Sequence, residues 1–198
     1  MRGREWLEHV YSGIVGGETR WMGARAQKNP LDAWVYQEII HDTRPEAIVE
    51  LGNAFGGGTL FLAHMLDLIG NGIVVAVDHN HSSFEADHER ITKVTGKTTE
   101  VVDQVREMVE GKRTMVIHDA DHRAPAVLAD LRLYAPLVSP GCYLVVEDGA
   151  GDVMGRKDPG PLQAIDAFLA ESPDFERDES RERFAFTYNP GGFLRRRG

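Results

Sequence analysis

The chain has 198 residues, of which 42% are hydrophobic and 27% are charged, the composition of one soluble globular domain. Its formal net charge of −9 argues against a nucleic-acid backbone as a partner. The single cysteine, Cys142, leaves no internal disulfide to form, so we expect a cytoplasmic location. The N-terminal residues lack the apolar segment of a signal peptide, and no stretch approaches the roughly 18 apolar residues of a membrane span.

The first 45 residues differ in character from the rest of the chain. Residues 11–27 are rich in glycine and do not resemble a core segment, whereas residues 30–42 have the spacing of a helix. We predict that residues 1–45 form an N-terminal arm or lid together with the first helix, and that residues 46–198 form the main domain. Such an arm also favours a homodimer or a larger homo-oligomer.

From residue 46 onward, strand-like and helix-like segments alternate. Apolar runs predict strands at 47–51, 72–78, 114–122 and 142–148, and helical spacing predicts helices at 58–69, 98–110, 124–138 and 161–172. The stretch 79–91 is too polar for a core, and residues 184–194 predict a hairpin around an Asn-Pro-Gly-Gly turn. This order predicts an α/β fold: a doubly wound, mostly parallel sheet with an antiparallel C-terminal hairpin.

Each predicted parallel strand ends in an acidic residue. The strand ends carry Glu50, Asp78, Asp119 and the adjacent pair Glu147 and Asp148. The carboxyl ends of parallel strands meet at one edge of the sheet, where open α/β sheets bind their ligands. Hydrophobic packing does not account for acids at every one of these ends, so we predict that this edge is the active site.

The turn after the first strand, "ELGNAFGGG", predicts a cofactor site. Its glycines permit close approach of a ligand to the backbone, but their spacing is not the dinucleotide-binding G-x-G-x-x-G. Glu50 would repel a pyrophosphate, whereas Asp78, 26 residues after Gly52, suits a ribose diol. A nucleoside with a ribose and a positive charge but no phosphate fits both, and S-adenosylmethionine is such a molecule. The alternative is a glycine turn that serves only tight packing.

A second acidic group follows two strands that we expect to be neighbours. Asp119, Asp121, Glu147 and Asp148 offer the oxygen ligands that suit Mg²⁺, with His122 close by. A metal ion would also supply the positive charge that two adjacent carboxylates need. We expect His122 to act as the general base, because histidine exchanges protons readily near neutral pH. The alternative is a set of exposed loop acids that bind no metal.

Several motifs together resemble one protein family. They are "WMGARAQKNPLDAWVYQEII", "RPEAIVELGNAFGGGTLFLA", "VVAVDHNH", "HERI", "VIHDADH", "YAPLVSPGCYLVVEDG" and "TYNPGGFLRR". They are similar to the rhamnosyl O-methyltransferase/cephalosporin hydroxylase family of Rossmann-like methyltransferases. The resemblance implies a seven-stranded sheet, S-adenosylmethionine, Mg²⁺, and methylation of a hydroxyl on a sugar or a natural product.

The resemblance also assigns residues to the two parts of the site. The cofactor site would comprise Glu50, Gly52, Asn53, Gly57, Thr59, Asp78, His79 and Asp119. The metal would be held by Asp119 or Asp121 with Glu147 and Asp148, and Asp119 is preferred because it leaves its strand first. His122 would be the base. One departure from the family pattern is Gly58, which precedes Thr59 where a hydroxyl residue is usual, and another is the missing Asn-Gly turn after Asp148.

Three other functions compete with a metal-dependent sugar O-methyltransferase. One is a hydroxylase-associated member of the same family, although no typical iron-binding arrangement stands out. Another is a catalytically silent subunit that binds the cofactor and acts as a scaffold. The third is a nicotinamide dehydrogenase, which the glycine spacing and Glu50 oppose. The acceptor sugar itself is left open by the sequence.

Overall fold

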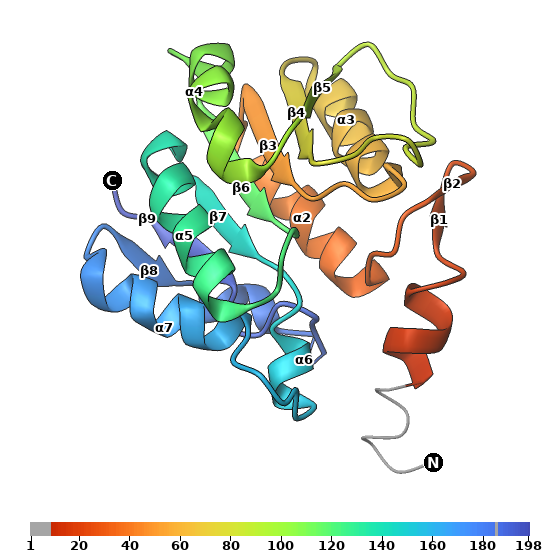
Figure 1. Cartoon of the computed structure of the whole chain (residues 1–198). Helices are drawn as coiled ribbons and strands as arrows, with labels where there is room; N and C mark the ends of the chain where they lie inside the picture. Colours follow the sequence, from red (N-terminus) through yellow and green to blue (C-terminus); the bar gives the residue numbers. More distant parts are fainter. Residues whose placement is uncertain (1–8, 185) are drawn as a thin grey trace.

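A seven-stranded sheet forms the centre of the computed structural model, which describes residues 9–184 and 186–198. Its strands run in the order β5-β4-β3-β6-β7-β9-β8 (Figure 1). The five parallel strands are β3 (Ala47–Leu51), β4 (Ile73–Asp78), β5 (Ile91–Thr95), β6 (Thr114–His118) and β7 (Tyr143–Val146). The antiparallel pair is β8 (Phe175–Arg177) and β9 (Phe193–Arg196). The predicted doubly wound sheet with antiparallel C-terminal strands is confirmed.

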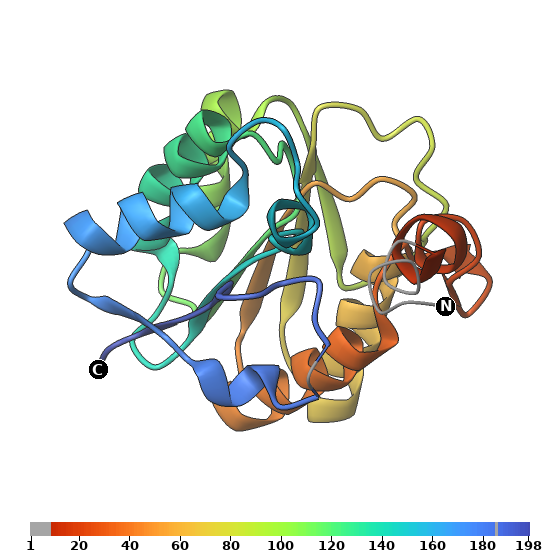
Figure 2. The ribbon, with the colours of Figure 1, turned by 90° about the horizontal axis from the view of Figure 1, so that it is seen from below.

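Helices cover both faces of this sheet (Figures 1 and 2). One face carries α2 (Pro30–Thr43) and α3 (Gly57–Ile69), which share a buried core with Ile48 and Met115. The other face carries α4 (Thr98–Val109), α5 (Ala124–Tyr134) and α7 (Pro161–Glu171), packed against Val49 and Val116. Because residues alternate between the faces along a strand, β3 and β6 are buried on both sides, which explains their unbroken apolar runs.

Short elements complete the chain. They are η1 (His9–Val15), β1 (Arg20–Trp21), β2 (Ala24–Arg25), η2 (Ala135–Leu137), α6 (Ala150–Val153) and η3 (Glu179–Glu182). The β1–β2 hairpin packs on α3: the Trp21 indole N–H donates to His64 Nδ1 at 2.9 Å, and the Trp21 ring meets Phe61 edge-on at 4.9 Å. The described region before α2 is therefore attached to the main body, whereas positions 1–8 of the predicted arm lie outside the described residues. Among the described residues, no helix is long and apolar enough to cross a membrane.

The start of α2 follows from its sequence. Asn29 caps the helix with its side-chain oxygen, which accepts the backbone N–H of Leu31 at 3.2 Å, and Pro30 occupies the first turn. Asp32 is buried there and accepts hydrogen bonds from the Thr187 hydroxyl (2.6 Å) and the backbone N–H of Tyr188 (2.8 Å). These contacts attach α2 to the segment that precedes β9.

The structure corrects the prediction at two edges of the sheet. β5 lies within and just after the polar stretch, and its mostly exposed side chains left no apolar run to recognise. In the C-terminal hairpin, the outer partner of β9 is β8, and residues 184 and 186–188 belong to no strand, while residue 185 of the predicted strand lies outside the described residues. Thr187 instead donates its hydroxyl, and Tyr188 its backbone N–H, to the Asp32 carboxylate. A strand of three residues at a sheet edge carries too short a pattern to be read from sequence.

We predict that Asp32→Ala destabilises the protein by about 2–3 kcal/mol, because it leaves buried donors without their acceptor. Urea unfolding followed by circular dichroism measures the loss. Asp42→Ala is the matched control, since Asp42 lies on the same helix with a side chain 51% exposed, and its loss should stay below about 1 kcal/mol. Equal losses in the two variants would contradict this account of how α2 is anchored.

Candidate active site

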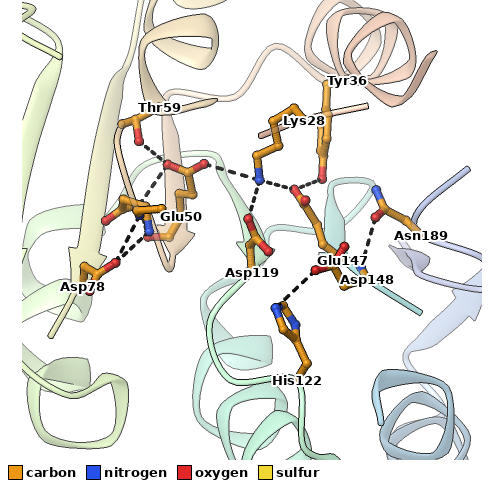
Figure 3. A network of polar contacts seen from close by, with 12 residues as sticks. Lys28, Tyr36, Glu50, Thr59, Asp78, Asp119, His122, Glu147, Asp148 and Asn189 are labelled. Atoms are coloured by element: carbon orange, nitrogen blue, oxygen red, sulfur yellow. Dashed lines mark hydrogen bonds and ion pairs between the residues drawn. The ribbon is translucent and has the colours of Figure 1, made fainter. Parts of the chain in front are cut away.

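The acidic strand ends do meet at one edge of the sheet (Figure 3). Glu50 lies in β3, Asp78 ends β4, Asp119 follows β6, and Glu147 and Asp148 follow β7. Two cavities open among these residues: a large cleft of about 720 Å³ near Asp78 and a smaller cavity of about 290 Å³ near Asp148. Asp119 lines both, so the two cavities adjoin at this residue.

The large cleft contains five of the eight residues predicted for the cofactor. They are Gly52, Asn53, Asp78, His79 and Asp119. Gly52 has a φ of +84°, and a Cβ at this position would lie 2.0 Å from the carbonyl oxygen of Asp119. Only glycine therefore lets the turn after β3 pass so close to the loop after β6. Gly52 and Asp119 both line the cleft.

Asp78 is held in its charged form inside the cleft. Its Oδ2 accepts the backbone N–H groups of Asn53 (2.9 Å) and Ala54 (3.3 Å), and its Oδ1 accepts that of Asn80 (3.1 Å). Partial burial opposes ionisation, but these hydrogen bonds outweigh it and keep the pKa of Asp78 below its ordinary value. The result is a fixed carboxylate at the end of β4, suited to accept hydrogen bonds from a diol.

The other three predicted cofactor residues do not line this cleft. Thr59 is fully buried and donates its hydroxyl to Glu50 Oε2 at 2.5 Å. Glu50 is 1% exposed and also accepts the Asn53 amide at 2.9 Å; burial raises its pKa to about 7, against the lowering effect of Lys28. Gly57 packs under the arm, where a Cβ would meet the Arg25 carbonyl oxygen at 2.3 Å. These residues hold the turn in shape around the cleft.

Lys28 lies at the centre of the acidic edge, although no pattern in the sequence pointed to it. Its Nζ lies 2.6 Å from Asp119 Oδ2, 2.8 Å from Glu147 Oε1 and 4.0 Å from Glu50 Oε1. Burial would lower the pKa of Lys28, but the three carboxylates outweigh it and raise the pKa well above its usual value. Tyr36 adds a hydrogen bond to Glu147 Oε1 at 2.6 Å. Lys28 thus supplies positive charge beside Glu147.

The smaller cavity gathers a set of metal-type ligands. Asp119, His122 and Asp148 each offer a ligand atom, and these atoms all lie within 4.8 Å of one another. His122 Nε2 lies 3.2 Å from Asp148 Oδ2, and Glu147 lines the same cavity. His122 Nδ1 is buried and has no hydrogen-bond partner among the described residues. Carboxylate oxygens suit a hard divalent cation, so Asp119, Asp148 and the nearby Glu147 fit Mg²⁺, and His122 lies beside them.

Asp148 and Asp121 differ in how they are placed. Asp148 has a φ of +64°, a conformation that side-chain-bearing residues rarely adopt, and its backbone N–H donates to Asn189 Oδ1 at 3.3 Å. This turn aims the Asp148 carboxylate at His122. Asp121 instead pairs with the Arg123 guanidinium, which lowers the pKa of Asp121 to about 2. Asp121 lines the large cleft and stands outside the Asp119–His122–Asp148 cluster.

An apolar cavity of about 510 Å³ adjoins the same network from the side of the arm. Its walls come from the β1–β2 hairpin, α2 and α3, and include Trp21, Ala33 and Phe61. Lys28 and Glu147 line it as well. Lys28 and Glu147 therefore separate an apolar space from the polar cluster at the sheet edge.

The strand order, the glycine turn after β3 and the acid that ends β4 together define the Rossmann-like methyltransferase fold. Residues 14–197 match the family model "Rhamnosyl O-methyltransferase/CmcI". The chain belongs to this family.

Curated relatives agree with that assignment. The rhamnosyl O-methyltransferase of Mycobacterium leprae is 36% identical over 206 residues, covering 98% of this chain and 90% of the relative. The protein of the same name from Mycobacterium tuberculosis is 34% identical over 204 residues, covering 96% of this chain and 83% of the relative.

Solved structures share the fold at lower identity. CmcI in an Mg–SAM form is 22% identical with a TM-score of 0.72, covering 91% of this chain and 77% of CmcI. The methyltransferase MycE of the mycinamycin pathway, in complex with Mg and S-adenosylhomocysteine, is 18% identical with a TM-score of 0.57, covering 82% of this chain and 48% of MycE.

We predict that Gly52→Ala lowers the melting temperature markedly, because the new methyl group meets the Asp119 carbonyl and the φ is positive. Gly70→Ala is the matched control, since Gly70 has a φ of +80° and a Cβ there would meet no atom within 4 Å, so this variant carries the backbone strain alone. Gly70→Ala should lower the free energy of unfolding by about 1–2 kcal/mol. Differential scanning calorimetry compares the two. An equal shift would mean that close approach at Gly52 is not what the turn requires.

Proposed function

We propose that the protein is a metal-dependent O-methyltransferase that moves the methyl group of S-adenosylmethionine to a hydroxyl of a sugar. The observation that carries this proposal is the shared position of Asp119, which lines the large cleft and also belongs to the cluster with His122 and Asp148. A methyl donor in the cleft and an acceptor hydroxyl at the cluster would then lie next to each other. The curated relatives named rhamnosyl O-methyltransferase support a sugar acceptor.

The cleft suits the cofactor in size and in charge. Its volume of about 720 Å³ falls within the range of small-molecule sites. The Asp78 carboxylate would accept the ribose diol, while Asp119 and Asp121 would disfavour a phosphate and tolerate a sulfonium cation. The complexes of CmcI with SAM and of MycE with S-adenosylhomocysteine support the same assignment.

Asp119 and Asp148 of the cluster, together with Glu147 in the same cavity, would hold Mg²⁺. A bound Mg²⁺ would lower the pKa of the acceptor hydroxyl. One histidine with carboxylates differs from the two-histidine, one-carboxylate set of non-haem iron oxygenases, so the geometry favours methyl transfer over hydroxylation. The Mg-containing forms of CmcI and MycE add support.

The reaction needs one proton acceptor and a defined line of approach. His122 Nε2 would take the hydroxyl proton while Asp148, at 3.2 Å, stabilises the resulting imidazolium. The acceptor oxygen would form its bond to the methyl carbon as the carbon–sulfur bond breaks, leaving neutral S-adenosylhomocysteine. Gln27 of the arm and Tyr188 line the cavity and would contact the sugar. A cytoplasmic location and self-association through the arm remain predictions.

Asp78→Ala is expected to weaken S-adenosylhomocysteine binding by at least about tenfold, because the diol loses its charged acceptor and the turn at Asn53 loses its anchor. Isothermal titration calorimetry, with Mg²⁺ and again with EDTA, measures the affinity. Asp87→Ala serves as the control, because Asp87 is exposed in the loop after β4. If the wild type shows no binding in either buffer, the methyltransferase proposal fails.

Asp148→Asn is expected to abolish Mg²⁺-dependent methyl transfer to rhamnosides while leaving S-adenosylhomocysteine affinity within about twofold of wild type. Asparagine tolerates the positive φ at this position, which isolates the loss of charge. Asp158→Asn, an exposed residue, is the control. If methyl transfer and cofactor affinity are lost together, the metal site and the cofactor cleft are not separate sites at this edge of the sheet.

A further inference from the structure

Lys28 and the predicted metal ion need the same ligands. Asp119 accepts a hydrogen bond from Lys28 and is also a member of the cluster with His122 and Asp148. Glu147 accepts from Lys28 and lines the cavity of that cluster. In Figure 3, the Asp119 side chain lies between Lys28 and His122. The Lys28 ammonium group therefore lies next to the site where the metal ion would bind.

The position of Lys28 is fixed by its surroundings. The residue directly precedes Asn29, the cap of α2, so its backbone is tied to the start of a helix. Its stem crosses Gly58, where a Cβ would lie 2.7 Å from Lys28 Cε, and its side chain is only 17% exposed. The glycine that departs from the family pattern thus makes room for the lysine. An amine held in this way cannot move into solvent without leaving buried carboxylates unpaired.

Two physical effects of Lys28 act against a metal ion. The amine occupies oxygen lone pairs of Asp119 and Glu147 at 2.6 and 2.8 Å, and its charge repels a divalent cation across a partly desolvated space. The same charge stabilises Glu50, Asp119 and Glu147 against one another. The acidic edge thereby keeps its structure while its affinity for a metal ion is reduced.

We propose that Lys28 is a built-in counter-cation that competes with the divalent cation for Asp119 and Glu147 and so sets the strength of metal binding. This inference rests on the proposed metal site. It makes Lys28 a positioning residue: it holds the carboxylates in place between metal-binding events and keeps the metal ion exchangeable.

The test is a Mn²⁺ titration of the full chain, with free Mn²⁺ followed by electron paramagnetic resonance. Lys28→Met removes the charge and keeps the length of the stem, and we expect it to bind Mn²⁺ at least about tenfold more tightly than wild type. Lys28→Arg keeps the charge and should stay within about threefold of wild type. Lys112→Met, an exposed lysine just before β6 at the opposite edge of the sheet, should not change the affinity.

Folding and cofactor binding are measured on the same samples. Lys28→Gln is a second neutral variant, whose amide can still donate to Asp119 and Glu147, and it replaces Lys28→Met if that variant does not fold. Unchanged or weaker Mn²⁺ binding in the folded neutral variant would overturn the inference. If neither wild type nor variant binds Mn²⁺, the proposed metal site falls with it, while S-adenosylhomocysteine affinity reports separately on the cofactor cleft.

Discussion

The site depends on how the repulsion among carboxylates at one end of the sheet is balanced. β3, β6 and β7 bring Glu50, Asp119 and Glu147 together, and two of these side chains are almost fully buried. Lys28 meets all three. Because buried like charges cannot all remain ionised without a counter-charge, the arrangement requires a cation that comes from outside the sheet.

The N-terminal region therefore contributes side chains to the candidate active site. Asn29 and Pro30 set the start of α2, and this fixes the residue before them, Lys28, above the strand ends. Tyr36, two turns into the helix, reaches Glu147 from the same side. Asp32 ties the helix to the segment before β9. The parallel sheet positions the acids, and the arm with α2 positions the groups that balance them.

The sequence predicted the sheet and its acidic edge because both leave a local signal. β3 matches its predicted residues 47–51, since burial on both faces produces an unbroken apolar run with a single acid near its end. β5 and β8 were missed because short, exposed edge strands carry little hydrophobic pattern. The spacing also grouped Asp119 with Asp121, whereas in the structure Asp121 pairs with Arg123 and lies outside the cluster that contains Asp119.

Other features depend on side-chain direction and on long-range contacts. Glu50 and Thr59 lie next to the glycine turn in sequence, yet the Thr59 hydroxyl donates a hydrogen bond to Glu50 and neither residue lines the large cleft. Lys28 is 91 residues from Asp119 and 119 from Glu147, and a loop lysine is normally solvated, so no local pattern distinguishes it. Only its position directly before a proline-containing helix cap marks a rigid backbone at this point.

The proposed cofactor cleft and the proposed metal site adjoin at Asp119. The most direct test is the nuclear magnetic relaxation of S-adenosylmethionine labelled with ¹³C at its methyl group, bound to the protein and titrated with Mn²⁺. We expect strong paramagnetic relaxation of the methyl carbon, reversed by excess Mg²⁺. Bound Mn²⁺ that leaves the methyl relaxation unchanged would show that the metal ion and the methyl donor bind apart from each other, which would rule out a shared site at Asp119.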